Sequence, residues 1–374
     1  MPGGSPAIRT VCAIAVAAAA GALLLKAFAG IDVAAAWHAA ASAGRWAPLA
    51  LVPFAVGMTL DATAIRTLLR VLGRKVPLAR LVAIRIATEA LHLTAPAGFV
   101  VADSATAALL EARCGVPVAE GAVLAIARKW LVMRAHAVYI LLGAAMGAAA
   151  LAGVSGRLLG GPWLPVAVAA SALAPLTLSL ALGAGFRGQP ALLRLQRALG
   201  RLPWEAVRAR VSRWRCGAVT VDGHLARIGA ARAATRRATL TYFIAWLVEA
   251  IETALILRLV GGPLDLGIAI AAEVGVSLVR SIGNVAPAGL GVQDAGYAVL
   301  FEALGVPAPT TAAFVLLKRG KELVWIASGY ALLAAMRRPA ADESARVAGG
   351  VARSAPMRAI FGETRGATPG QSAV

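Results

Sequence analysis

Long apolar runs alternate with short polar segments along this chain of 374 residues. The uncharged runs include residues 10–25, 47–60, 135–156, 158–186 and 238–248. A helix needs about 20 apolar residues to cross the hydrocarbon layer of a membrane. The runs show no period-two alternation, which argues against a β-barrel. The pattern predicts an all-α, polytopic transmembrane helical bundle with about eight membrane segments.

Composition supports this fold class and changes how the charge is interpreted. Hydrophobic residues make up 59% of the chain, charged residues 15%, and the mean hydropathy is +0.76. The net charge of +19 is placed between the apolar runs, at Arg66, Arg70, Arg74 and Lys75 and in a cluster over residues 187–237. Basic loops of this kind face the cytoplasm. We therefore exclude nucleic acid as the partner. Arginine outnumbers lysine and alanine is abundant, which suggests a GC-rich bacterial genome, so we expect a protein of the bacterial cytoplasmic membrane.

The cluster at 187–237 interleaves arginine with leucine, valine and Trp204. It reads as a cytoplasmic linker of amphipathic helices on the anionic leaflet, or as a solvated basic loop that only sets orientation. Residues 337–374 are rich in Pro, Gly and Ala and are predicted to form a disordered cytoplasmic tail. The three cysteines, Cys12, Cys114 and Cys216, have no metal-ligand spacing. No metal, cofactor or disulfide is predicted.

One segment occurs twice. Ala-Pro-Ala-Gly at 95–98 and again at 286–289 is followed by an aspartate, a glutamate, Gly-Val-Pro and a basic pair. The offset is 191 residues as far as the glutamate and 190 after it. Pro and Gly interrupt helices, so each copy predicts a broken helical hairpin, at 77–113 and at 266–304. The paired landmarks are Asp103 and Asp294, Glu111 and Glu302, Arg128-Lys129 and Lys318-Arg319.

Counting crossings gives the two hairpins opposite orientations. With both termini in the cytoplasm, the N-terminal membrane half is 1–186 and the C-terminal half is 238–336. Hairpin 77–113 then begins and ends inside, and hairpin 266–304 begins and ends outside. An inverted repeat with two broken elements is the pattern of transporters with alternating access. Four charged residues at 318–322 fall inside the last span, which requires that they be paired.

Ionisable side chains mark a polar route through the bundle. Arg85, Glu89 and His92 share one helical stripe that leads to Pro96, and Glu273 and Arg280 share another that leads to Pro287. Glu89 and Arg280 occupy equivalent repeat positions and are candidates to pair. Glu249 and Glu252 are expected partners of Lys318 and Lys321. The alternatives are structural pairing for these groups, a buried histidine instead of a proton carrier at His92, and helix capping for Asp103 and Asp294.

The second copy resembles a known family. Residues 287–294 (Pro-Ala-Gly-Leu-Gly-Val-Gln-Asp), followed by Leu-Gly-Val-Pro at 304–307 and a base at Lys318 or Arg319, look like the lysylphosphatidylglycerol synthase transmembrane region. This family of flippase-like integral membrane proteins includes stand-alone members associated with hopanoid synthesis. The resemblance covers about residues 10–336. The first copy lacks the family's glutamate and arginine after the turn, and the stretch after Arg338 is too short to imply an aminoacyl transferase.

We expect a lipid transporter rather than an enzyme, since no hydrolytic, redox or nucleotide-binding motif is present. Its cargo would be a phospholipid or an aminoacylated, polyprenyl-linked or hopanoid-type lipid, with anionic groups drawn to Arg280, Lys318 and Arg319. The alternatives are an intramembrane enzyme, an accessory subunit of lipid or envelope synthesis, and a scaffold for synthesis enzymes. The residues expected at the substrate are Glu89, Pro96, Gly98, Asp103, Arg280, Pro287, Gly289, Gly291, Asp294, Lys318 and Arg319. The supporting polar network is expected to contain Arg85, His92, Glu249, Glu252, Glu273, Lys321 and Glu322.

Overall fold

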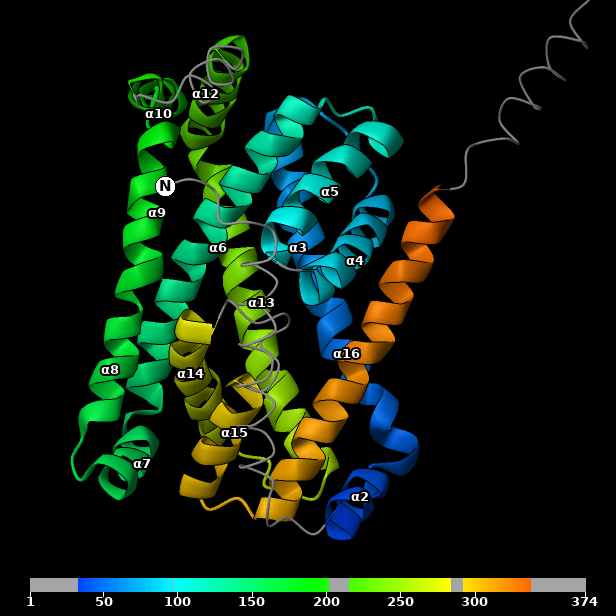
Figure 1. The fold of residues 1–374 in the computed structure, drawn as a ribbon, viewed down its shortest axis with the longest axis vertical. Coiled ribbons are helices and arrows are strands. Elements are labelled where there is room, and N and C mark those ends of the chain that lie inside the picture. The colour runs from blue at the N-terminus through cyan, green and yellow to red at the C-terminus, as the bar shows by residue number, and fades with distance from the viewer. Residues whose placement is uncertain (1–32, 96, 202–214, 284–291, 338–374) are drawn as a thin grey trace, which may run out of the picture. The chain divides into compact units, whose positions relative to one another are not determined.

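The computed structural model describes residues 33–95, 97–201, 215–283 and 292–337, and all regular secondary structure in these ranges is helical (Figure 1). The predicted first span at 10–25 and the tail after residue 337 lie outside them. In chain order the helices are α2 (Val33–Ser42), the 3₁₀ helix η1 (Gly44–Ala50), α3 (Leu51–Val71), α4 (Leu78–Thr94), α5 (Gly98–Cys114), α6 (Val118–Met146), α7 (Ala148–Leu159), α8 (Trp163–Ser171), α9 (Leu173–Phe186), α10 (Ala191–Gly200), α12 (Arg215–Ala230), α13 (Arg232–Leu259), α14 (Leu266–Gly283), α15 (Val292–Ala303) and α16 (Ala308–Arg337).

Three stretches in the described ranges are long and apolar enough to cross a membrane: Gly44–Val71, Trp163–Phe186 and Arg232–Leu259. Helices α6 and α7 add a fourth if they count as one span, although they meet at an angle of 73°. The sequence predicts one continuous span over 132–156, whereas the structure ends α6 at Met146 and bends at Gly147. The bend brings Gly147 against Ala271 of α14, where an added Cβ would lie 3.2 Å from the alanine Cβ.

Three to four apolar spans lie in the described ranges, which do not include the predicted first span, so the total of about eight stays a prediction. Helices α4, α5, α14 and α15 contain 17, 17, 18 and 12 residues, which is near or below the lower limit of about 17 residues for a membrane-spanning helix. Helix α16 has 30 residues but carries Lys318, Arg319, Lys321 and Glu322 in its middle. These helices therefore qualify as membrane segments only if they are short elements packed against the longer ones.

Helices α3 and α13 pack along each other, and α6 packs against α13 beside them. Beside this group, α4 and α5 form one pair, in which α4 contacts α3 and α5 contacts α6. Helices α14 and α15 form a second pair, in which α14 contacts α13 and α6. The two pairs lie toward opposite ends of α6 and α13 in Figure 1. A buried apolar cluster joins α13, α14 and α15 to the start of α16, where Phe301 and Phe314 meet edge to face at 4.9 Å between ring centroids.

The break between α4 and α5 depends on small residues. Ala97 has a positive φ of 52°, which only glycine adopts without strain, and α5 begins directly after it at Gly98. A Cβ at Gly98 would lie 2.0 Å from the backbone oxygen of His92, so no larger residue fits there. Close approach also occurs where α16 crosses α4, because a Cβ at Gly329 would lie 2.6 Å from the backbone oxygen of Ile86. Small side chains thus place the α4–α5 pair in the bundle.

Part of the basic linker predicted at 187–237 is described as α10 and α12, which pack together. The carboxylate of Asp222 in α12 accepts hydrogen bonds from the backbone N–H groups of Leu192 and Leu193, each at 3.1 Å. A carboxylate there satisfies donors that the first turn of a helix leaves unpaired. Helix α12 also packs on α6 and α9, so this part of the linker is fixed to the bundle.

Candidate functional site

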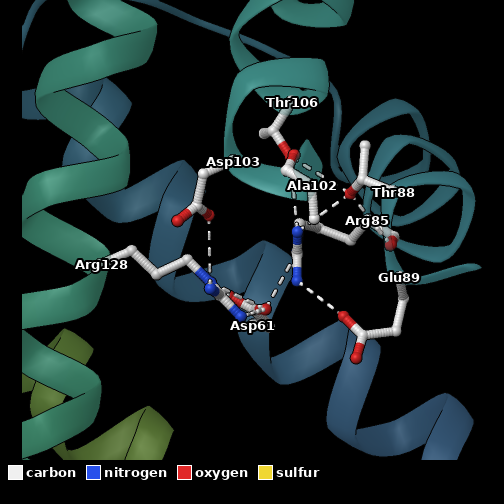
Figure 2. A network of polar contacts seen from close by, with 8 residues as sticks. All are labelled: Asp61, Arg85, Thr88, Glu89, Ala102, Asp103, Thr106 and Arg128. Carbon is white, nitrogen blue, oxygen red and sulfur yellow. Dashed lines mark hydrogen bonds and ion pairs between the residues drawn. The ribbon is translucent and has the colours of Figure 1, made fainter. Parts of the chain in front are cut away.

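A first network of charged side chains is centred on Asp61 of α3. Its carboxylate accepts a hydrogen bond from Nε of Arg85 in α4 at 2.9 Å. Arg128 of α6 donates to the same carboxylate through Nε and Nη2 at 2.9 to 3.1 Å. Figure 2 shows the two guanidinium groups reaching Asp61 from different helices. One buried carboxylate therefore holds a buried arginine, Arg85, and a partly buried one, Arg128.

The remaining donors of Arg85 are also satisfied. This side chain is 2% exposed and donates to Thr88, Thr106 and Glu89 at 3.0, 3.4 and 3.1 Å. Asp103 of α5 lies 3.7 Å from Arg128 (Figure 2). Asp103 is in the interior of α5, which begins at Gly98, so it is not a helix cap. Ion pairs buried in this way are tolerated because each charge has partners.

A second network surrounds Glu252 of α13. Its carboxylate accepts a hydrogen bond from Lys321 and lies 3.7 Å from Nζ of Lys318. The Lys318 ammonium also donates to Glu273 of α14 at 3.4 Å and to the Tyr297 hydroxyl of α15 at 3.0 Å. Tyr297 in turn donates to Glu273 at 2.5 Å. The expected pairing of Glu252 with the two lysines is present, and Glu273 joins it.

Arg319 continues this network toward α15. Its guanidinium binds the Asp294 carboxylate through two nitrogens, with distances of 2.8 to 3.2 Å, and binds Glu322 at 2.5 Å. Asp294 lies in the first turn of α15, where a negative charge is also favoured by the helix dipole. The four charges that the sequence places inside the last span are thus all paired, which offsets the cost of burying them.

The two networks match across the internal repeat. Asp61 and Glu252 are 191 residues apart, the offset that also relates Asp103 to Asp294, and Arg128 and Lys318 are 190 apart. Asp61 is absent from the residues that local spacing singles out, because it is the lone charge of its apolar stretch and has no charged neighbour on its own helix turn. Extending the repeat offset back to α3 is the sequence signal that finds it. Arg128 is already a landmark of the repeat, whereas Tyr297 is identified only by its contacts with Glu273 and Lys318.

A cavity of about 430 Å³ opens between the networks. Its wall includes Asp61 and Arg128 from the first network and Glu252, Lys318 and Lys321 from the second. His92 and Glu89 of α4 face it, as does Glu249 of α13, which is close enough to Lys318 for an electrostatic interaction. Glu322 also lines the cavity. The remaining lining residues are uncharged: Pro53, Phe54, Gly57, Met58, Leu93, Val132, Tyr242, Ala245, Trp246, Val248 and Gln293.

Several expected site residues lie outside what the structure describes. Pro96, Pro287, Gly289 and Gly291 fall in the gaps, and the side chain of Arg280 at the end of α14 is likewise not described. The expected pairing of Glu89 with Arg280 therefore stays a prediction, and the described partner of Glu89 is Arg85. The second-copy turn, which carries the more specific sequence motif, has no described geometry.

The described side chains offer a ligand charged and polar groups to bind. Within the described ranges, no group of three or more His, Cys, Asp or Glu side chains is arranged to hold a metal ion. Lys318 and Arg319 are expected to attract an anionic group, yet both are bound by carboxylates, so an anion reaches them only in competition with Glu273 and Asp294. What the cavity offers a ligand is a polar, charge-lined chamber inside an otherwise apolar bundle.

Comparison with known proteins gives one informative match. No curated protein and no solved structure matches the chain significantly. A protein-family model does match, and it covers residues 11–329, the region that contains both networks and the cavity. The chain is all-helical where described, has apolar spans, and belongs to the family described as the lysylphosphatidylglycerol synthase TM region.

Proposed function

We propose that this protein binds the polar headgroup of an amphipathic lipid in the cavity between the two networks and moves the lipid across the bacterial cytoplasmic membrane. The observation that carries the proposal is the cavity itself, about 430 Å³ and lined by charged residues from both halves of the chain. That volume is within the usual range of about 300–1,000 Å³ for small-molecule sites. Ionisable groups inside a membrane protein mark substrate or ion pathways.

An inverted repeat gives this cavity a mechanism. The pairs α4–α5 and α14–α15 each contribute one acidic residue, Asp103 and Asp294, to a base on the long helix that follows. The pairs lie toward opposite ends of α6 and α13 (Figure 1). We infer that the two halves rock about the packed α3 and α13, so that the cavity faces one leaflet and then the other. Lipid tails would stay in the bilayer beside exposed apolar residues such as Val52 and Val56 of α3.

A cavity-filling substitution tests the proposal without disturbing a charge. Gly57 of α3 lines the cavity, and a Cβ built on it meets no atom within 4 Å. In Gly57→Leu the side chain occupies the headgroup space while the ion pairs remain. We expect the rate of lipid movement to fall by about tenfold or more, which corresponds to losing about 1.4 kcal/mol of headgroup binding.

The measurement uses purified protein in vesicles of phosphatidylethanolamine and phosphatidylglycerol with a trace of headgroup-labelled phospholipid. A membrane-impermeant quencher reports how fast label reaches the outer leaflet. Gly153→Leu is the matched control, because Gly153 of α7 is also a helix glycine with open space around it but does not line the cavity. Equal rates for the two variants would show that the cavity is not the route. No acceleration by the wild type over protein-free vesicles would remove the transport function for this class of lipid.

A further inference from the structure

The two networks are built on matched carboxylates but use different cations. Asp61 of α3 is held by Arg85 and Arg128, whereas Glu252, its repeat counterpart on α13, is held by Lys318 and Lys321. All four cations are mostly or fully buried, and the two lysines are each 6% exposed. The two halves of the site therefore place a carboxylate at the same repeat position and differ in the chemistry of the positive charge.

This difference decides what each network can do when its helices separate. An arginine stays protonated in proteins, so the first network has to keep its charges paired through any movement. A buried lysine readily gives up its proton when it loses its partner. A charge left unpaired in the bilayer interior is costly, and breaking a buried pair by removing one partner costs about 3–5 kcal/mol. The second network is able to avoid that cost by releasing a proton, and the first is not.

The surroundings of the lysines make such a release possible. Both line the cavity, which connects them to water or to a headgroup when it is open. The Lys318 ammonium is shared between Glu252 and Glu273, so one lysine is enough to keep Glu252 paired after the other moves away. The other charged or titratable side chains that contact this cluster or face it across the cavity are Asp61, Glu89, His92, Arg128, Tyr242, Glu249, Asp294, Tyr297, Arg319 and Glu322.

We propose that the Glu252–Lys318–Lys321 cluster carries the proton that couples lipid movement to the proton gradient, while the Asp61–Arg85–Arg128 cluster is a fixed hinge. The inference rests on the proposed transport function. In the closed cluster both lysines are ammonium ions and Glu252 and Glu273 are carboxylates. On opening, Lys321 leaves Glu252, its N–H bond breaks, and the proton passes to water on the open side. The neutral amine keeps the electron pair, and Glu252 stays paired with Lys318. Closing on the other side takes up a proton again.

The first experiment detects the titration directly, without any lipid movement. Lys321 lies over the Phe54 ring at 5.5 Å, and Phe54 contacts the Trp325 ring at 5.0 Å, so Trp325 reports on the cluster. Trp246 stacks on His136 at 4.0 Å and would report that histidine, so the titration is done in a Trp246→Phe background. Tryptophan fluorescence of the full-length protein in nanodiscs is followed between about pH 5 and 10, the range in which a perturbed lysine titrates.

We expect a single reversible transition that disappears in Trp325→Phe and in Lys318→Arg/Lys321→Arg. Absence of the transition in the Trp246→Phe protein overturns the inference, whether or not the arginine variant folds. So does a transition that persists unchanged in a folded Lys318→Arg/Lys321→Arg protein. Each outcome is independent of whether the protein transports lipid.

The second experiment links the proton to transport. Lipid movement in the vesicles described above is measured with and without an imposed pH gradient at clamped membrane potential. A gradient of one pH unit changes the wild-type rate by up to about tenfold if one proton accompanies each lipid. In Lys318→Arg/Lys321→Arg the rate, whatever its value, should be the same with and without the gradient. A wild-type rate that does not change with the gradient would overturn the coupling and leave the transport function intact. No lipid movement at all would overturn the transport function, and the fluorescence titration would then decide whether the cluster is a proton site.

Discussion

At the scale of single residues, Asp61 compensates more buried charge than any other carboxylate of the first network. It accepts from both Arg85 and Arg128, and neither guanidinium has another contact to Asp or Glu closer than 3.1 Å within the described structure. Glu120 forms a similar bidentate pair with Arg74, at 2.7 and 2.8 Å, but Arg74 is 39% exposed at its side chain. The same chemistry thus occurs both in the interior of the bundle and at a surface.

Replacing the acid in each pair should give very different losses of stability. Asp61→Asn leaves the buried Arg85 and the partly buried Arg128 without the carboxylate they share, which we expect to destabilise the protein by about 3–5 kcal/mol. Glu120→Gln leaves Arg74 free to turn into water, and surface pairs contribute only about 0–1 kcal/mol. Thermal unfolding of the purified proteins in detergent compares the two. A melting temperature for Asp61→Asn as high as that of Glu120→Gln would contradict the central role of Asp61.

At the scale of helices, the pairing that the sequence predicts joins two groups of neighbouring charges inside apolar stretches, Glu249 with Glu252 and Lys318 with Lys321. Burying Lys318 and Lys321 without partners would be costly, and Glu252 lies on a neighbouring span. The cost of burying an unpaired charge is therefore enough to predict this pairing. The contact of Asp61 with Arg128 spans 67 positions and depends on how α3 packs against α6, which no local spacing specifies. The sequence does not mark the bend at Gly147 either, because the run around it is mostly alanine and glycine. Tertiary packing, not local pattern, decides both.

The junction between α4 and α5 offers a test of how tightly an element is held. Gly98→Ala places a methyl group 2.0 Å from the His92 carbonyl oxygen, so the two helices must move apart. Overpacking of this kind costs about 1–3 kcal/mol. Gly153→Ala puts the same methyl group into open space on α7 and should stabilise its helix by up to about 1 kcal/mol. Thermal unfolding of both variants gives the comparison; equal melting temperatures would mean that the helix break is loosely packed.

At the scale of the whole molecule, the distribution of charge sets the orientation in the membrane. The positive excess is gathered in the short loop before α4 and in the region of α10 and α12, and both lie between apolar spans. Helix α12 packs on α6 and on α3, and α3 leads into the loop before α4. The two basic regions therefore lie at the same end of α6. The turn between α7 and α8 follows α6 at its other end. From this charge distribution the positive-inside rule predicts α12 in the cytoplasm and the α7–α8 turn outside.

Cysteine labelling tests this orientation with two matched glycines. Gly156 near the end of α7 and Gly223 in α12 are both exposed, and a Cβ on either meets no atom within 4 Å, so each accepts a cysteine without strain. The background replaces Cys12, Cys114 and Cys216 with serine. In intact cells a membrane-impermeant maleimide should label Gly156→Cys and spare Gly223→Cys, which becomes reactive only after the membrane is opened. The opposite entry of the two helix pairs rests on this crossing count, so the reverse labelling would require each pair to enter from the other side than proposed. Equal labelling of both sites in intact cells would place the two ends of α6 on the same side of the membrane. That result would contradict the inverted-repeat mechanism.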